Sequence, residues 1–281
     1  MRCYLLLECS VPKSSRSSET NEDASTFEPG QNYVWAAVAD GTSEGAYSRL
    51  WARALVEQLN ASERRRWCRN FPNRKQWFER FIDEAGQKFS KDLPEHRPWY
   101  IEASLERGVS ATLAIARVDR KNHKLSLAAV GDCCIAYWFE GERPCSWPLQ
   151  NSRAFHNAPA TVTWMPFCSA LNPPVELYVR NLDIHDSRSI SIALMTDALA
   201  LWFVRELENG GTPHERLLEL AATQAVGLTS PRRSRRGLAK LAASPERACE
   251  HFTAWVRELR QRKQLRDDDT TLVLLRCDLD R

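Results

Sequence analysis

The sequence predicts an α+β sandwich, and three observations support this prediction. Short runs of β-branched and aliphatic residues recur along the chain, other segments repeat apolar residues at helical spacing, and the strands come in groups with helix pairs between them. A regular alternation of strand and helix would favour βαβ units instead. With 281 residues, 43% of them hydrophobic, the chain can bury a sizeable core, and we expect residues 1–281 to form one domain.

The predicted strands are short apolar runs that end at turn-forming or charged residues. The first apolar run, Cys3–Leu7, is too short for a signal sequence or a membrane span, so we expect a strand there. The strands are expected at Tyr4–Glu8, Tyr33–Ala39, Thr112–Val118, Lys124–Val130, Ile135–Phe139, Ser189–Met195 and Thr271–Arg276.

Helices are predicted where apolar residues recur every three or four positions. The expected ranges are Tyr47–Leu59, Gln76–Phe89, Ala200–Leu207, His214–Ala225 and Pro245–Arg262. Two segments lack such a pattern. Gly141–Pro174 contains six prolines and predicts a long surface excursion, while Gly227–Gly237 combines turn formers with arginines and predicts a mobile basic loop.

Cysteine usage and charge limit the cellular setting and the partner class. The nine cysteines form no CxxC pair and no metal-ligand spacing, which favours free thiols in a reducing cytoplasm. The net charge of +3 is too small to indicate a partner. Arginines cluster at Arg64–Arg66, beside Trp67 and Phe71, and a solvated face is favoured there over nucleic-acid binding. We therefore predict no nucleic-acid and no membrane partner.

The most informative feature is the position of acidic residues at strand ends. Asp40, Asp132 and Asp197 each follow an apolar run, and Asp267–Asp269 precede the last one. Any one of them alone would be a turn or cap residue. A carboxylate at the edge of an apolar core costs several kcal/mol unless it is paired or coordinated. Four such strand ends indicate a shared positive charge.

A hard divalent cation is the predicted counter-charge, because no cationic side chain lies beside each acid and because Mg²⁺ and Mn²⁺ prefer oxygen ligands. Gly41 follows Asp40 directly, and a residue without Cβ lets its carbonyl oxygen approach an ion. With Glu22 and Asp23 from the early loop, the carboxylates suffice for two ions that share Asp40. Two ions roughly 4 Å apart can activate water and bind a phosphoryl oxygen.

Six short segments in order resemble the motifs of the PP2C (PPM) phosphatases. They are Asn21–Ala24, Val38–Gly41, Gly108–Leu113, Val130–Asp132, Met195–Ala198 and Asp268–Leu272. Each segment is weak evidence alone, but the ordered set spans nearly the whole chain. The resemblance implies a four-layer αββα sandwich of two antiparallel sheets flanked by helix pairs. It also implies phosphoserine and phosphothreonine substrates in proteins and a metal site at one end of the sandwich.

The resemblance also implies the ligand set. Asp40 would bridge the two ions and Gly41 would contribute its carbonyl oxygen. Glu22 would bind one ion, while Asp197 and Asp268 would bind the other. Water would attack the phosphate directly, with no covalent enzyme intermediate.

Two further acids have supporting roles in this scheme. Asp23 would orient the attacking water from behind the ligands, and Asp132 would help to hold a weaker third ion beside Asp197. Asp132 could instead cap the turn after Gly131. The ligand within Asp267–Asp269 depends on register, and the spacing to the threonines favours Asp268.

The sequence departs from the family pattern at two positions. The arginine that grips the substrate phosphate is expected four residues before Glu22, where this chain has Ser18. Arg16 or Lys13 could replace it, because a guanidinium is the best phosphate fork and an ammonium supplies a point charge. Ala198 stands where the family mostly has Gly, which requires a negative φ there.

These departures leave a second function open. The chain could be a catalytically weak or silent phosphatase fold that binds a kinase or another signalling protein. Its complete set of acids argues against this alternative. The expected partners of an active enzyme are a phosphorylated protein substrate and the Ser/Thr kinase that it opposes.

Overall fold

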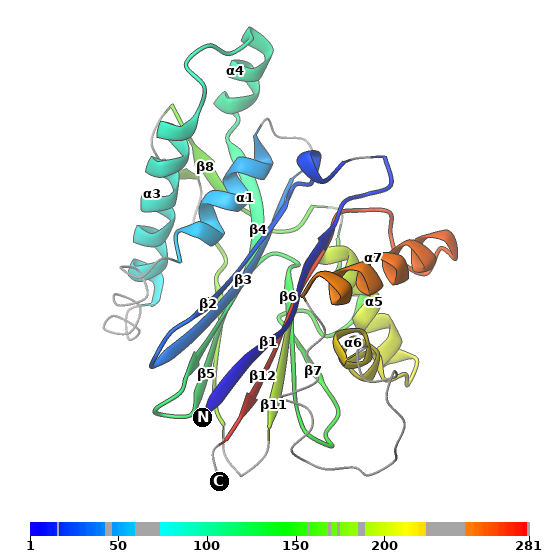
Figure 1. Ribbon diagram of the computed structural model, residues 1–281. Helices are drawn as coiled ribbons and strands as arrows, with labels where there is room; N and C mark the ends of the chain where they lie inside the picture. Colours follow the sequence, from blue (N-terminus) through cyan, green and yellow to red (C-terminus); the bar gives the residue numbers. More distant parts are fainter. Residues whose placement is uncertain are drawn as a thin grey trace.

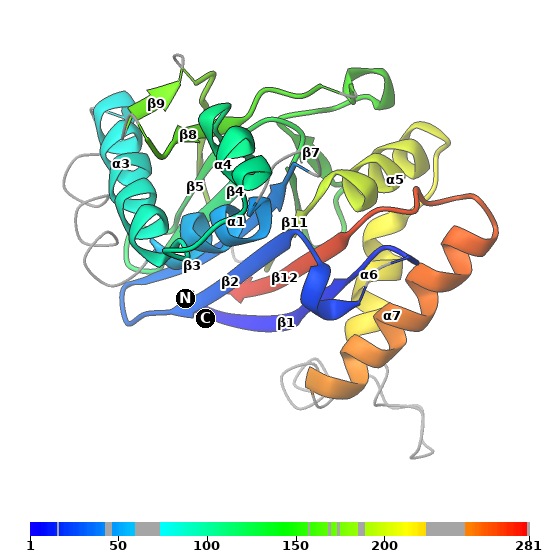
Figure 2. The same ribbon diagram turned by 90° about the horizontal axis from the view of Figure 1, so that it is seen from above.

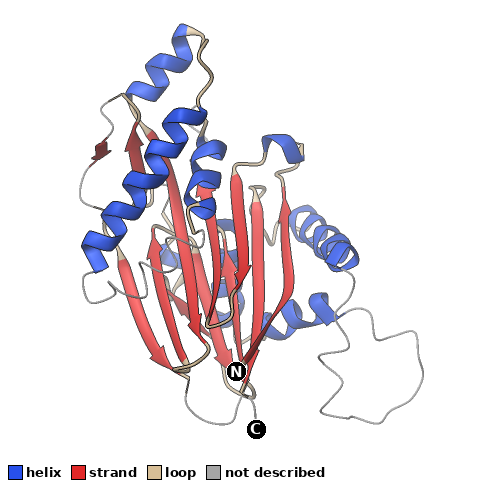
Figure 3. Ribbon diagram, turned by 60° about the vertical axis from the view of Figure 1, so that its left-hand side comes forward, coloured by secondary structure: helices blue, strands red, loops and turns tan. Residues whose placement is uncertain are grey.

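The computed structural model has four layers, two antiparallel sheets packed face to face and helices on both outer sides (Figures 1 and 3). This confirms the predicted α+β sandwich. The described residues are 1–15, 17–42, 47–59, 74–156, 158–167, 170–172, 175–184, 189–222 and 245–279.

The first sheet brings the two ends of the chain together, because β1 pairs with β12. Its strand order is β1 (Arg2–Val11), β12 (Thr270–Asp278), β11 (Ile190–Met195), β6 (Cys134–Phe139) and β7 (Cys145–Trp147). The second sheet is ordered β10 (Tyr178–Asp183), β5 (Lys124–Val130), β4 (Val109–Asp119), β3 (Tyr33–Gly41) and β2 (Asp23–Pro29). Beside β4 lie the short strands β8 (Val162–Met165) and β9 (Ala170–Asn172).

The helices form the two outer layers, one group against each sheet (Figure 1). Beside the second sheet lie α1 (Ser48–Glu57), α3 (Arg74–Asp92) and α4 (Trp99–Glu106). Beside the first lie α5 (Asp197–Glu208), α6 (Pro213–Ala222) and α7 (Pro245–Gln261). Two 3₁₀ turns, η1 (Ser18–Thr20) and η2 (Ser152–Ala154), complete the described elements.

The sequence of β3 suits a central strand whose two faces are both buried. Val34, Ala36 and Val38 point into the core between the two sheets. Alternate residues, Trp35 and Ala37, point instead toward α1 and α3. Because side chains alternate between faces, a continuous apolar run is what such a central strand requires.

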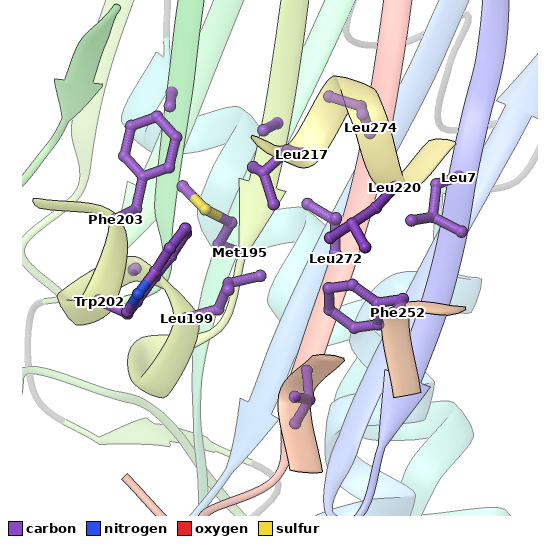
Figure 4. Close-up of a cluster of buried hydrophobic side chains, with 14 of the residues drawn as sticks. Leu7, Met195, Leu199, Trp202, Phe203, Leu217, Leu220, Phe252, Leu272 and Leu274 are labelled. Carbon is purple, nitrogen blue, oxygen red and sulfur yellow. The ribbon is translucent and has the colours of Figure 1, made fainter. Parts of the chain in front are cut away.

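The outer core of the first sheet packs strands against helices in the same way (Figure 4). Leu272 and Leu274 of β12 lie beside Leu7 of β1, facing Phe252 of α7. Trp202 and Trp255 meet edge to face, with ring centroids 4.8 Å apart, and join α5 to α7. This packing fixes α7 on the sheet that carries the last strand.

The expectation of a surface excursion at Gly141–Pro174 was wrong in part. The segment contains β7 and β8, and Trp164 of β8 is 1% exposed. The Trp164 ring stacks on Trp51, and a Cβ added at Gly86 of α3 would lie 2.2 Å from the ring. Strands β7 and β8 are too short to show an alternation of apolar and polar residues. The prolines around them therefore favoured the prediction of a surface loop. The basic segments 227–237 and 64–66 lie outside the described residues.

The expectation that all thiols are free was wrong for four cysteines. Disulfides join Cys3 to Cys277 across β1 and β12, and Cys9 of β1 to Cys249 of α7. The partners are 274 and 240 residues apart, so no local spacing could indicate them. The remaining described cysteines, Cys133, Cys134 and Cys145, are free. A cytoplasmic location stays a prediction.

The described helices lack the features of a membrane span. None of them combines the length and the hydropathy that a bilayer crossing requires. The longest described helix, α3, has 19 residues and alternates charged with aromatic side chains.

Candidate metal centre

The strand-end acids gather at one end of the sandwich, opposite the end that carries the chain termini (Figure 1). Asp23, the first residue of β2, lies directly across from Asp40 near the end of β3. Asp132 follows β5, whose last residue pairs with Leu113 of β4. Asp197 opens α5 directly after β11, and Figure 2 views the sandwich from this end.

The acids lie close enough for their charges to interact strongly. Burial raises the pKa of Asp40 well above its ordinary value. The negative charges that raise it further belong to Asp23, Asp197, Asp132 and Asp268. Burial, followed by the charges of Asp132 and Asp268, raises the pKa of Asp197 to about 7. Burial raises the pKa of Asp132 to about 6. Without a counter-charge, this group of carboxylates opposes its own ionisation.

Asp23 is held by a buried hydrogen-bond network. Its Oδ2 accepts hydrogen bonds from Thr196 Oγ1 at 2.9 Å and from Thr271 Oγ1 at 2.7 Å. Thr271 Oγ1 in turn lies 2.6 Å from Ser10 Oγ, which accepts a hydrogen bond from Asn21 Nδ2. The second carboxylate oxygen, Oδ1, is buried without a hydrogen-bond partner. Burial raises the pKa of Asp23 to about 8, and its unpartnered Oδ1 can still accept a hydrogen bond.

The turn before β12 assigns different tasks to its three acids. Asp267 Oδ1 accepts hydrogen bonds from the backbone N and Oγ of Ser14. Asp269 is 3% exposed, and its two oxygens accept from the backbone N–H groups of Lys13 and Glu22, both at 2.8 Å. Among the described residues, Asp268 accepts a hydrogen bond only from the neighbouring backbone N–H of Asp269, at 3.0 Å, and it is the member of the turn whose charge acts on both Asp40 and Asp197. This division supports Asp268 as the ligand within the turn.

Glu22 and Gly41 are fixed through their backbones. The N–H of Gly41 donates to the carbonyl oxygen of Glu22 at 3.2 Å, and the N–H of Glu22 donates to Asp269. A Cβ added at Gly41 would lie 2.7 Å from the carbonyl oxygen of Ser48, at the start of α1. Only glycine therefore lets β3 pass this close to the helix.

The donor chemistry of the site fits a hard divalent cation. The groups are carboxylates, one of which has an orphaned oxygen, and their mutual repulsion needs a positive charge. Within the residues that the structure describes, however, no three His, Cys, Asp or Glu side chains converge tightly enough to hold an ion as they stand. We expect repulsion to keep uncompensated carboxylates apart, so a bound ion would have to draw them closer.

Two basic side chains lie at the rim of the acidic group. Lys13 Nζ is 3.7 Å from Asp268 Oδ1. Arg266 Nη1 is 3.6 Å from Asp197 Oδ2, and its charge lowers the pKa of both Asp197 and Asp132. These cations offset part of the negative charge and leave the centre of the group uncompensated.

Comparison with known proteins identifies the family. The family model described as "Protein phosphatase 2C" matches residues 12–222, well over half of the chain. The chain belongs to the protein phosphatase 2C family. No curated protein matches the sequence.

Solved structures of phosphatases share the fold of this protein phosphatase 2C member. The photosystem II phosphatase PBCP is 14% identical, with 99% of each chain covered and a TM-score of 0.53. Stp1 from Staphylococcus aureus is 11% identical, with 100% of this chain and 94% of that chain covered and a TM-score of 0.52. The catalytic domain of PstP, in complex with two manganese ions, is 14% identical, with 99% and 98% covered and a TM-score of 0.52. At these identities the likeness shows the fold.

The departures from the protein phosphatase 2C pattern have different outcomes. Ala198 lies in the first turn of α5, is 1% exposed and does not have a positive φ, so its methyl group is accommodated. Ser18 lies exposed in η1. Arg16 lies outside the described residues, and of the two proposed replacements the structure describes only Lys13.

The sequence reasoning missed the groups that support Asp23. Thr196 and Thr271 bond to its carboxylate and Ser10 bonds to Thr271, although these residues are 173 to 261 positions from their partners. Thr196 and Thr271 also stand at the ends of apolar runs. This position is the sequence signal that could have identified them, as it identified the acids. Arg260 of α7, which contacts the Asp268 turn, gave no sequence signal.

Proposed function

We propose that residues 1–281 form one phosphatase domain that hydrolyses phosphoserine and phosphothreonine in proteins with two Mg²⁺ or Mn²⁺ ions. The observation that carries the proposal is the interaction of the Asp40 charge with those of Asp23, Asp132, Asp197 and Asp268, in a member of this family. A phosphorylated protein is the proposed substrate, and the kinase that phosphorylates it is the proposed signalling partner.

The proposed ligands follow the acidic group. Asp40 would hold both ions, Glu22 and the Gly41 carbonyl oxygen one of them, and Asp197 and Asp268 the other. Bound divalent ions would supply Lewis acidity toward a phosphoryl oxygen and would make water a nucleophile at neutral pH.

Other residues of the chain prepare the attack on phosphorus. Asp23 Oδ1, buried and unpartnered, would accept a hydrogen bond from the attacking water and orient it. Thr196 and Thr271 fix the Asp23 carboxylate by bonding to its other oxygen. Asp132 would help to hold a weaker third ion beside Asp197, where Arg266 already supplies a positive charge.

Release of phosphate from a phosphoserine or phosphothreonine peptide tests the proposal. Purified protein with Mn²⁺ is expected to release phosphate, to stop when a chelator is added and to recover when Mn²⁺ is restored. A phosphotyrosine peptide is the control substrate and should be cleaved far more slowly. Protein that binds Mn²⁺ but cleaves none of the peptides would favour the silent signalling module.

Lys13 is the proposed phosphate-binding residue among those described, because its ammonium group lies at the rim beside Asp268. Replacing Lys13 with Met should raise KM for the phosphopeptide roughly 10- to 100-fold, the loss expected for a hydrogen bond to a charged group, without weakening Mn²⁺ binding. Lys88→Met is the matched control, since Lys88 pairs with Glu57 on the surface of α3. An unchanged KM in Lys13→Met would exclude this role.

A further inference from the structure

Arg260 is a buried cation that belongs to none of the groups discussed as ligands. Its side chain, near the C-terminal end of α7, is 5% exposed. A buried charge is retained only where its donors find partners. The two terminal nitrogens of the guanidinium have such partners on two segments that are far apart in the sequence, while Nε has no hydrogen-bond partner among the described residues.

One set of partners lies where the chain leaves β1. Arg260 Nη1 donates to the carbonyl oxygen of Pro12 at 2.7 Å, and Nη2 donates to that of Val11 at 3.3 Å. The next residue, Lys13, is bonded through its backbone N–H to Asp269. The contact therefore fixes the segment that leads to the rim of the candidate metal centre.

The other set of partners lies in the turn that carries Asp268. Arg260 Nη2 donates to the carbonyl oxygen of Asp268 and, at 2.9 Å, to Thr270 Oγ1. Its Nε lies 3.7 Å from Asp267 Oδ1. Thr270 Oγ1 also donates to the Asp268 carbonyl, so the backbone of Asp268 is held from two directions.

We propose that Arg260 is a positioning residue that holds the Asp268 turn against the exit of β1 and thereby sets the place of the Asp268 carboxylate in the metal centre. The inference rests on the proposed function, which makes Asp268 a ligand. Both residues lie beyond residue 222, where the family match ends. The planar guanidinium serves several acceptors in fixed directions, which a lysine cannot do.

Helix α7 is anchored in a way that suits this role. Phe252 and Val256 pack fully buried against the first sheet, and the Cys9–Cys249 disulfide joins the helix to β1. Arg260 thus projects from a fixed helix onto the turn between α7 and β12. Turns are in general more mobile than the helices and strands that they connect. A rigid support is what a metal ligand on a turn needs.

The test is Mn²⁺ affinity, measured by calorimetry on the full chain without substrate. Arg260→Met should weaken Mn²⁺ binding by about 10- to 100-fold, the usual loss when a group supporting a metal ligand is removed. Arg260→Lys keeps the charge and should recover only part of the affinity. Combining Arg260→Met with Asp268→Asn should add little to the loss in Asp268→Asn alone, since both act on one ligand.

Two control variants separate positioning from general stability. Arg120 also donates to backbone carbonyls, those of Met1 and Gly30, but at the end that carries the termini. Arg120→Met should lower Tm without changing Mn²⁺ affinity. Arg257, exposed one turn earlier on α7, should tolerate replacement by Met in both measurements.

The outcomes are distinct from those that test the phosphatase proposal. Unchanged Mn²⁺ affinity in folded Arg260→Met, or in Arg260→Lys if the Met variant does not fold, would overturn the positioning role and leave the phosphatase proposal intact. Weakened Mn²⁺ affinity in Arg260→Met, together with a wild-type protein that cleaves no phosphopeptide, would support the positioning role and contradict the phosphatase proposal. Equal losses of Mn²⁺ affinity in the Arg120→Met and Arg260→Met variants would also overturn the positioning role.

Discussion

Replacing Asp40 with Asn is expected to lower phosphopeptide hydrolysis by about a thousandfold or more. The substitution keeps the shape of the side chain but removes the charge proposed to hold both ions. Several kcal/mol of transition-state stabilisation depend on these ions, which corresponds to three or more powers of ten in rate. Steady-state phosphate release with saturating Mn²⁺ measures the effect.

Asp119 offers the matched control for this substitution. It is 4% exposed and caps the turn after β4, where its Oδ1 accepts hydrogen bonds from the backbone N–H groups of Lys121 and Asn122. It lies at the end of β4 away from Asp40, which pairs with Thr112 at the start of that strand. Asp119→Asn should lower Tm and spare kcat. If Asp40→Asn retained wild-type activity, the ligand assignment would be wrong.

The stability of the metal-free protein is expected to fall as pH rises from about 4 to about 8. Burial raises the pKa of Asp132 to about 6, of Asp197 to about 7 and of Asp23 to about 8, from an ordinary value of 3.8. In this window the folded state binds more protons than the unfolded state, so each rise in pH favours unfolding. Denaturant unfolding at pH 5 and pH 8 with chelator present measures the difference.

Bound Mn²⁺ should reverse this trend, because it supplies the charge that the carboxylates lack. At a concentration of 100 times Kd, one bound ion contributes about 2.7 kcal/mol, or roughly 5–10 °C in Tm. The Asp40→Asn variant should show a flatter pH dependence and a smaller response to Mn²⁺. Metal-free protein that became more stable from pH 5 to pH 8 would contradict the crowding of the acids.

The central strands and the strand-end acids were predictable because each is encoded locally. An apolar run such as 33–39 predicts a buried strand, and the acid that follows it lies near the end of that strand, paired on both sides. The family motifs placed Asp23 and Asp40 in separate segments, and the sheet register brings them opposite each other. The choice of Asp268 over Asp269 needed the hydrogen bonds of the turn.

The remaining features depend on contacts that no local pattern encodes. Trp164 is buried because Gly86 of α3 leaves space for its ring, in a segment that prolines made look exposed. The Cys9–Cys249 disulfide and the contacts of Arg260 to Pro12 join residues about 240 positions apart. Such pairings arise only when the sheets and helices have packed together. The sequence predicts the fold class, but it does not predict these individual contacts.

Calorimetric titration of the metal-free protein with Mn²⁺ tests the central claim, that separate strand ends of this fold bring carboxylates together to bind divalent cations. The wild-type protein should bind two Mn²⁺ ions and release them when a chelator is added. The Asp40→Asn variant should lose this binding while remaining folded. Wild-type protein that takes up no Mn²⁺, or an Asn variant that binds as the wild type does, would contradict the account.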